Sequence, residues 1–148
     1  MKTVLVTGGS GFIGRHLCLA AKNPDWQLLV LTRDSHNASK HLPNYVTLID
    51  DLSQLDEYPS VDILVNLAGQ SLAEGRWTEK RKAQLLDSRI GTTDRLYKYF
   101  KNRDGQPPKV VISGSAIGFY GAGNGDDKPI AENASSEANF SQYLCASQ

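Results

Sequence analysis

The chain has 148 residues, enough for one domain of ordinary size. Its 16 Lys and Arg balance 16 Asp and Glu, so it lacks the excess of cations that general affinity for nucleic acids requires. Hydrophobic residues make up 40% of the sequence and charged residues 22%, which excludes a disordered polar chain. No apolar run reaches the roughly 18 residues of a membrane-spanning helix.

The chain shows no sign of secretion or of a metal site. Its two cysteines, Cys18 and Cys145, are too few for a disulfide framework or a zinc site. The apolar run at the N-terminus breaks at Gly8, which is too early for a signal peptide. We therefore expect a cytoplasmic protein without nucleic-acid or membrane partners.

Apolar runs alternate along the chain with segments of helical periodicity. The helical segments are residues 11–22 and 78–101, while the polar stretch 32–44 indicates a loop or a weak helix. Five runs predict buried strands, at residues 4–6, 27–31, 46–49, 61–66 and 110–112. Strands that are apolar throughout and alternate with helices predict a doubly wound α/β fold with a parallel sheet. No linker divides the chain, so we expect residues 1–148 to form a single dinucleotide-binding domain of the Rossmann-like type.

The segment after the first strand contains Gly-x-Gly-x-x-Gly, at Gly9, Gly11 and Gly14. In this context, between a strand and a helix, the first glycine permits a tight turn, the second lets the backbone approach a pyrophosphate, and the third lets the helix pack closely. Free N–H groups at the start of the helix then favour phosphate binding. The predicted cofactor loop comprises Thr7, Gly8, Gly9, Ser10, Gly11, Phe12, Ile13 and Gly14.

The end of the second strand bears on the choice of cofactor. An acidic residue there binds the ribose 2′-hydroxyl of NAD, and an arginine binds the 2′-phosphate of NADP. Arg33 lies nearer the strand end than Asp34, which favours NADP while leaving NAD open. After the third strand, Asp51 and Leu52 are expected either to flank the adenine or to cap a helix.

Three stretches resemble the extended, epimerase-like branch of the short-chain dehydrogenase/reductase superfamily. They are the glycine loop, the Asn66–Gly69 segment, and Ser113–Ala116 with Phe119–Gly121. The resemblance implies that Leu67, Ala68, Gly69 and Ser113 lie along the cofactor.

Further segments narrow the resemblance to a subgroup whose members are labelled epimerase family proteins or nucleoside-diphosphate-sugar epimerases. These are Arg76–Thr78, Ser88–Arg89 and the run Ser113–Gly121. The implied chemistry is hydride transfer between a nicotinamide and a hydroxyl or carbonyl carbon. Ser115 would supply the hydrogen-bonding hydroxyl.

The superfamily's proton-transfer pair is a Tyr with a Lys four residues later, expected some 25 residues after Ser115. No Lys follows Lys128, so this pair is missing after Ser115. A tyrosine with a pKa of about 10 is a poor base at neutral pH without such a Lys. Tyr120 is a candidate substitute acid, or else a packing residue.

Two further pairs have open interpretations. Arg76 and Trp77 could hold an anionic or sugar-like substrate, or form a loop anchored by a buried Trp. Arg89, next to Ser88 inside the predicted long helix, could face the cofactor or be solvated.

Extended members of the superfamily are roughly twice this length, and their later half binds most of the substrate. The chain is therefore expected to be the first half of a longer enzyme, and in the extreme case a truncated, inactive form. Without the later strands, the sheet would expose an apolar edge, which favours homo-oligomers. The alternatives are a non-catalytic dinucleotide-binding or sensor module, and a protein-interaction protein that binds no nucleotide.

Overall fold

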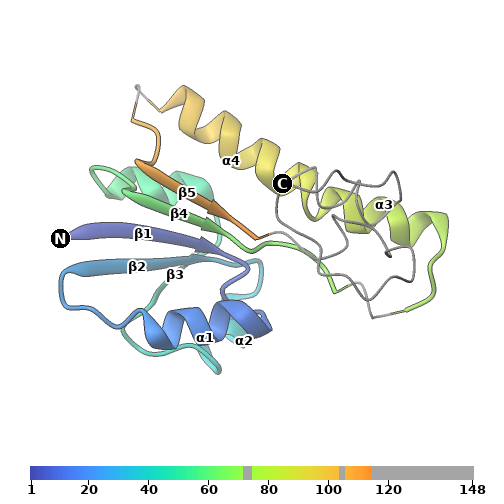
Figure 1. The fold of residues 1–148 in the computed structure, drawn as a ribbon, viewed down its shortest axis with the longest axis horizontal. Coiled ribbons are helices and arrows are strands. Elements are labelled where there is room, and N and C mark those ends of the chain that lie inside the picture. The colour runs from blue at the N-terminus through green and yellow to red at the C-terminus, as the bar shows by residue number, and fades with distance from the viewer. Residues whose placement is uncertain (72–74, 104–105, 115–148) are drawn as a thin grey trace, which may run out of the picture.

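The structure is a computed structural model that describes residues 1–71, 75–103 and 106–114. Its centre is a parallel sheet in the order β3-β2-β1-β4-β5 (Figure 1). The strands are β1 Lys2–Thr7, β2 Trp26–Leu31, β3 Thr47–Ile49, β4 Ile63–Asn66 and β5 Val110–Ser113. The chain moves outward from β1 to one edge and then returns to the other, which confirms the predicted doubly wound, Rossmann-like fold.

The helices lie between consecutive strands. They are α1 Phe12–Ala20, α2 Ser35–Ser39, the 3-10 helix η1 Leu52–Glu57, α3 Glu79–Asp87 and α4 Ile90–Asn102. The predicted weak helix within 32–44 is α2, and η1 begins at a cap that Asp51 provides. Within the described residues, no helix has both the length and the apolar character needed to cross a bilayer.

Alternate residues of the strands face two separate cores. On one face, Val4 and Val6 pack with Cys18 of α1. On the other, Leu5 packs with Leu55 of η1 and Phe100 of α4. Since side chains of a strand alternate between faces, this arrangement explains why the strands are apolar throughout. Burial raises the pKa of the Cys18 thiol, as expected for a core residue.

The predicted single helix over 78–101 is wrong, because the structure has two helices that break at Ser88 and Arg89. The Ser88 hydroxyl donates to the Leu85 carbonyl, which offers the backbone an alternative to regular helix. In the two helices Leu85, Leu96 and Phe100 are buried, whereas Tyr97 is 62% exposed.

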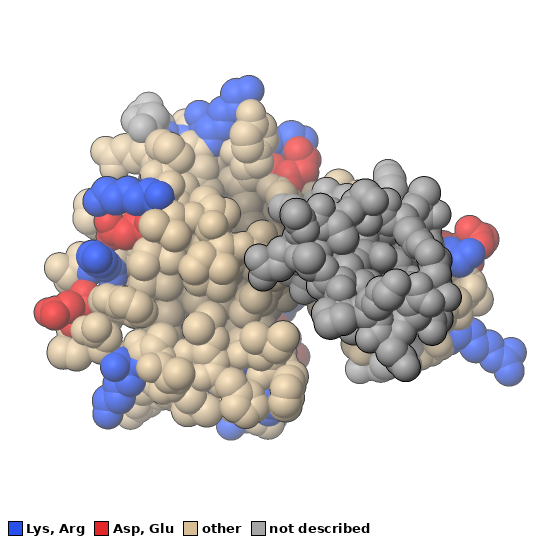
Figure 2. All heavy atoms as spheres, viewed as in Figure 1, with Lys and Arg blue, Asp and Glu red and all other residues tan. Residues whose placement is uncertain are grey.

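The strand β5 forms an apolar edge of the described sheet. Val110, Val111 and Ile112 are all exposed, although successive side chains of a strand point to opposite faces of the sheet. In Figure 2 the charged side chains lie mainly around the rim of the sheet-containing half, and the centre of the visible face is largely uncharged. Among the described residues β5 is therefore an exposed apolar edge strand.

Candidate functional site

A cavity of about 670 Å³ lies at the carboxyl ends of the strands. Thr7, Leu31 and Asn66 occupy equivalent positions of β1, β2 and β4, so these three strands end together. Ligands of open α/β sheets bind outside the carboxyl ends, where the strand order reverses. The described lining includes Thr7, Gly8, Ser10, Gly11, Leu31, Thr32, Arg33, Asp34, Asp50, Asp51, Leu52, Leu67, Ala68, Gly69, Gln70, Asp87, Ser88, Thr92, Arg95 and Leu96.

The conformation of the glycine loop leaves no room for side chains at two positions. Gly8 has a φ of +68°, and a Cβ there would lie 2.4 Å from the Leu67 carbonyl oxygen. A Cβ on Gly14 would lie 2.3 Å from the Gly8 carbonyl oxygen, which confirms the close packing predicted for this residue. The Gly11 N–H donates to the Gly8 carbonyl at 3.0 Å and closes a turn through Gly9, as predicted, while the positive φ belongs to Gly8. Gly9 is also constrained by the Val30 side chain, 2.8 Å from its missing Cβ.

The start of α1 is open toward a ligand. Gly11 is the N-cap residue and offers no side-chain acceptor, so the first turn of α1 is not capped by a side chain. The Gly11 backbone lines the cavity. Uncapped N–H groups and the positive end of the helix dipole suit a phosphate, which is the requirement of a dinucleotide.

The ends of β2 and β3 form one side of the cavity. Arg33 is exposed and lines it, as the sequence predicted. The neighbouring Asp34 has an oxygen that accepts from the Asn37 N–H at 2.9 Å and caps α2. The structure thus brings a cation to the predicted position and engages the nearby carboxylate in a helix cap.

Asp51 caps a helix, one of the two roles that the sequence left open, and it also lies in the cavity lining. It lines the cavity with Leu52 and also caps η1, with Oδ1 accepting from the Ser53 N–H at 2.8 Å. Gln54 completes the capping box by accepting from the Asp51 N–H. The Ser53 hydroxyl, followed by the Ser53 N–H, lowers the pKa of the Asp51 carboxyl, so this residue is anionic near neutral pH.

A buried polar network lies beneath the cavity. The Thr7 hydroxyl donates to Asn66 Oδ1 at 2.6 Å, and Asn66 Nδ2 donates to Thr93 Oγ1 at 3.2 Å. The Ala68 N–H also approaches Asn66 Oδ1, at 3.4 Å. These hydrogen bonds connect β1, β4 and α4. They therefore link the start of the glycine loop to the loop that follows β4.

The opposite side of the cavity includes residues that sequence reasoning did not assign to it. Asp87, Ser88, Thr92 and Arg95 line it from the end of α3 and the first turns of α4. The signal that could have revealed them is the pair Ser88 and Gly91, two residues that are unfavourable inside a helix and lie close to the break. Arg89 is half-buried against the loop after β4, so the interpretation of a freely solvated side chain is wrong.

Several predicted site residues lie away from this cavity. Phe12 and Ile13 begin α1 but are 75% and 67% exposed and do not line the cavity. Ser113 ends β5 beside Asn66, also outside the lining. Leu67, Ala68 and Gly69 do line it, in agreement with their predicted place along the cofactor.

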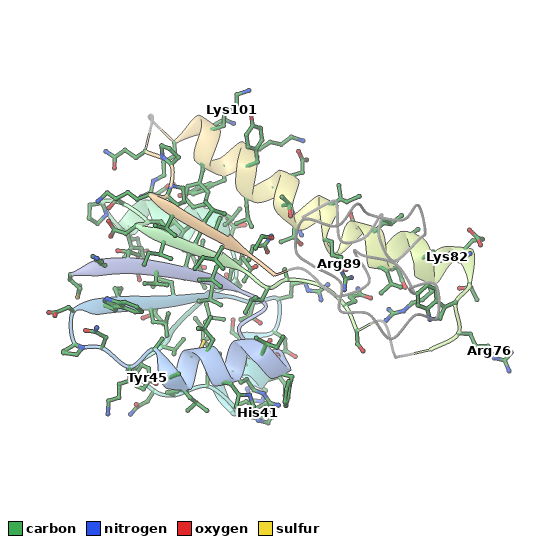
Figure 3. The ribbon with its side chains drawn as sticks, viewed as in Figure 1. His41, Tyr45, Arg76, Lys82, Arg89 and Lys101 are labelled. Carbon is green, nitrogen blue, oxygen red and sulfur yellow. The ribbon has the colours of Figure 1, made fainter. Side chains whose placement is uncertain are left out.

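The predicted substrate residues are not brought to the described cavity. Arg76 points outward near the far end of α3 (Figure 3). Trp77 is 46% exposed, so a loop anchored by a buried Trp is wrong. The predicted catalytic residues Ser115 and Tyr120 lie outside the described residues.

A Tyr-x-x-x-Lys spacing does occur earlier in the chain, at Tyr97 and Lys101 of α4. Lys101 Nζ lies 5.6 Å from the Tyr97 ring centroid. Figure 3 places Lys101 at the end of α4 remote from Arg89, and neither residue lines the cavity. The pair therefore does not supply the proton-transfer group of this site.

Comparison with known sequences identifies relatives over most of the chain. Residues 4–147 match the NAD dependent epimerase/dehydratase family. An epimerase family protein of Staphylococcus saprophyticus is 38% identical over 120 residues, 81% of this chain and 39% of the relative. The epimerase family protein YfhF of Bacillus subtilis is 34% identical over 119 residues, 80% of this chain and 39% of the relative. The chain thus spans well under half the length of these curated relatives.

Solved structures show the same fold. Human epimerase family protein SDR39U1, solved with NADPH, matches with a TM-score of 0.71 and 26% identity over 98% of this chain and 46% of that protein. UDP-glucose 4-epimerase from Bifidobacterium longum, solved with NAD+ and UDP, matches with a TM-score of 0.75 and 19% identity over 98% of this chain and 46% of that enzyme.

Proposed function

The chain belongs to the NAD dependent epimerase/dehydratase family, and on that premise we propose that it binds NADP in preference to NAD as part of an epimerase-like oxidoreductase. The single observation that carries the proposal is the cavity at the carboxyl ends of the strands. Its described lining combines the glycine loop, the uncapped start of α1 and Arg33.

The residues present fit a dinucleotide. Gly8 and Gly11 line the cavity and carry no side chain, so a pyrophosphate can approach their backbone closely. Leu31 and Leu52 provide apolar surface near the ends of β2 and β3, as an adenine requires. The volume of about 670 Å³ is in the range of ordinary cofactor cavities.

The preference for NADP rests on Arg33. A guanidinium pairs with a phosphate through two parallel hydrogen bonds, which a ribose hydroxyl cannot accept with the same strength. Asp34 is the nearby residue that would favour NAD, and one of its carboxylate oxygens already caps α2. The human relative solved with NADPH supports the same choice.

The proposed reaction is hydride transfer to and from a hydroxyl-bearing carbon of a nucleoside-diphosphate sugar. A bound nicotinamide would supply the hydride chemistry. Ser115 is proposed to hydrogen-bond the reacting oxygen and Tyr120 to act as the acid, in place of the missing Tyr-Lys pair. Arg76 and Trp77 remain the proposed substrate contacts, although neither residue lines the described cavity.

A second candidate is a non-catalytic dinucleotide-binding or sensor module. The observation that favours it is the absence of a Tyr with a Lys four residues later anywhere after Ser115. Turnover of any sugar substrate that depends on Ser115 would exclude this candidate.

The test is calorimetric titration of the 148-residue chain with NADPH and with NADH. We expect the wild type to bind NADPH about tenfold more tightly, since hydrogen bonds to charged groups contribute about that much. Arg33→Ala should bind both cofactors with similar affinity. Lys40→Ala is the matched control, because it removes an exposed cation beside α2 without altering the cavity lining.

Three results would contradict the proposal. Tighter binding of NADH by the wild type would reverse the assignment of the cofactor. An NADPH preference that persists in Arg33→Ala would show that another group binds the 2′-phosphate. If neither cofactor binds, the dinucleotide site itself is wrong for this chain.

A further inference from the structure

We propose that Arg89 is a positioning residue, which, together with Ser88 and Arg81, holds residues 69–71 in the shape that the dinucleotide cavity requires. This inference rests on the proposed binding of a dinucleotide. It assigns a function to the break between α3 and α4, which sequence reasoning did not foresee.

Gln70 is the residue through which the loop is held. Its N–H donates to Ser88 Oγ at 3.0 Å, and its backbone carbonyl accepts from Arg89 Nη2 at 3.2 Å. Its side-chain carbonyl accepts from Arg81 Nη1. Three polar groups of one loop residue are thus bound by three side chains of the α3–α4 segment. Arg81 Nη2 also donates to the carbonyl of Ser71, at 2.7 Å.

Arg89 is itself fixed to the end of α3. Its Nη1 donates to the Leu85 carbonyl at 3.3 Å and lies 3.4 Å from Ser88 Oγ. Leu85 is completely buried, so this end of α3 is a rigid support. One planar guanidinium therefore bridges a buried helix turn and the loop carbonyl of Gln70. A lysine, with a single nitrogen, cannot reproduce this two-sided bridge.

The loop backbone is in direct contact with the guanidinium. A Cβ on Gly69 would lie 3.0 Å from Arg89 Cζ and 3.1 Å from Nη2. Glycine at this position lets the guanidinium lie close to the backbone. Gly69, Gln70 and Ser88 all line the cavity, so a displaced Arg89 would change the cavity wall.

Residues 69–71 and Arg33 follow strands on opposite sides of β1, so substitutions at the two places should affect ligand binding differently. The strand order places β2 and β3 on one side of β1 and β4 on the other. Arg33 follows β2, while the loop follows β4. Figure 3 shows Arg89 at the junction of α3 and α4, beside the end of the sheet. A perturbed loop should therefore weaken binding of the whole dinucleotide more than binding of its adenosine half.

The experiment measures the Kd of NADPH and of 2′,5′-ADP for the wild type, Arg89→Ala and Gly69→Ala. Both variants should bind NADPH about tenfold more weakly, because each removes or displaces charge-assisted bonds that hold the wall. Binding of 2′,5′-ADP should change less than twofold. Loss of stability alone would weaken both ligands equally, which makes their ratio the informative quantity. Lys98→Ala, an exposed cation of α4, is the control.

A double-mutant cycle tests whether Gly69 acts through Arg89. If the added methyl group weakens binding by displacing the guanidinium, Gly69→Ala should have little further effect in an Arg89→Ala background. Arg89→Ala and Gly69→Ala change the same contact from its two sides, so either variant alone tests the positioning function if the other folds poorly.

The possible failures are distinct. An unchanged NADPH affinity in Arg89→Ala, or an equal loss for both ligands, would overturn the positioning function and leave the dinucleotide site intact. Additive effects in the cycle would show that Gly69→Ala does not weaken binding through its contact with Arg89. A wild type that binds neither ligand would overturn the proposed function first.

Discussion

The two loops that form the cavity wall acquire their shapes by opposite physical means. The glycine loop depends on missing atoms, because a Cβ at Gly8 or Gly14 would collide with backbone oxygen within 2.4 Å. The 69–71 loop depends on added atoms, since two arginines and a serine bind it through hydrogen bonds.

The difference determines how each loop responds to change. A collision with backbone cannot be relieved by moving a flexible side chain, so a substitution at Gly8 or Gly14 should destabilise the whole fold. Hydrogen bonds contribute about 1 kcal/mol each and can be replaced by water at an accessible site, so the 69–71 loop can shift while the sheet stays folded. The following substitutions test this comparison, beginning with the largest effect.

Gly14→Ala should produce the largest loss. The new methyl group would lie 2.3 Å from the Gly8 carbonyl oxygen and 2.6 Å from the Gly9 Cα. We expect the free energy of unfolding to fall by about 3 kcal/mol, the upper range for overpacked sites. Urea denaturation followed by circular dichroism measures this loss.

Gly11→Ala provides the matched control for that loss. The nearest atom to its missing Cβ is the Gly8 carbonyl oxygen at 3.2 Å, so the stability should change by less than about 1 kcal/mol. Equal losses at Gly11 and Gly14 would show that collision with backbone does not determine the loop's shape.

The Thr7–Asn66 contact joins the two regions and should have an intermediate effect. Asn66→Ala leaves the Thr7 hydroxyl, which is 1% exposed, without its acceptor. Such an orphaned group destabilises a fold by about 2 kcal/mol. Urea denaturation of Asn66→Ala, Thr7→Val and the double variant measures the coupling between them. The double variant should lose less than the sum of the singles, because it leaves no hydroxyl unpaired. Strict additivity would contradict this reading of the network.

Much of the sheet could be predicted from the sequence, because its signals are local. Each buried strand is a continuous apolar run, and Gly14 and Arg33 follow strand ends at recognisable spacings. The structure places Arg33 in the cavity lining as predicted. The turn runs through Gly9 as predicted, but nothing in the glycine pattern indicates that the residue of positive φ is Gly8.

The other side of the cavity could not be predicted in the same way. The periodic apolar pattern over 78–101 favoured one helix, whereas Ser88 ends α3 by bonding to a local carbonyl and to Gln70, 18 residues earlier. Arg89 similarly binds a carbonyl 19 residues away. Contacts between residues so far apart in the sequence produce no periodic pattern. The residues that shape this side of the cavity could therefore be identified only from the three-dimensional structure.

The smallest expected effect concerns the other end of α4, which is also held by polar bonds. The Tyr99 hydroxyl donates to Asp56 Oδ1 at 2.7 Å and so connects α4 to η1. Burial, followed by this bond, raises the pKa of Tyr99 from 10 to about 12. The neutral hydroxyl is thus favoured by folding, and its contribution is complete below pH 10 and is lost as the pH rises toward 12. A region shaped by glycines has no comparable dependence on pH.

Tyr99→Phe should remove that alkaline step and reduce stability at pH 7 by about 1 kcal/mol, the usual contribution of one hydrogen bond. Urea denaturation at pH 7, 9.5 and 11 measures the difference between wild type and variant. That difference should shrink as the pH rises from 9.5 to 11, because the wild type loses its hydroxyl contribution there. Tyr97→Phe, two residues along α4 and 62% exposed in the wild type, should keep the step. If Tyr99→Phe still loses stability between pH 9.5 and 11, other groups cause the alkaline loss. The hydrogen bond between Tyr99 and Asp56 would then contribute little to the stability of the fold.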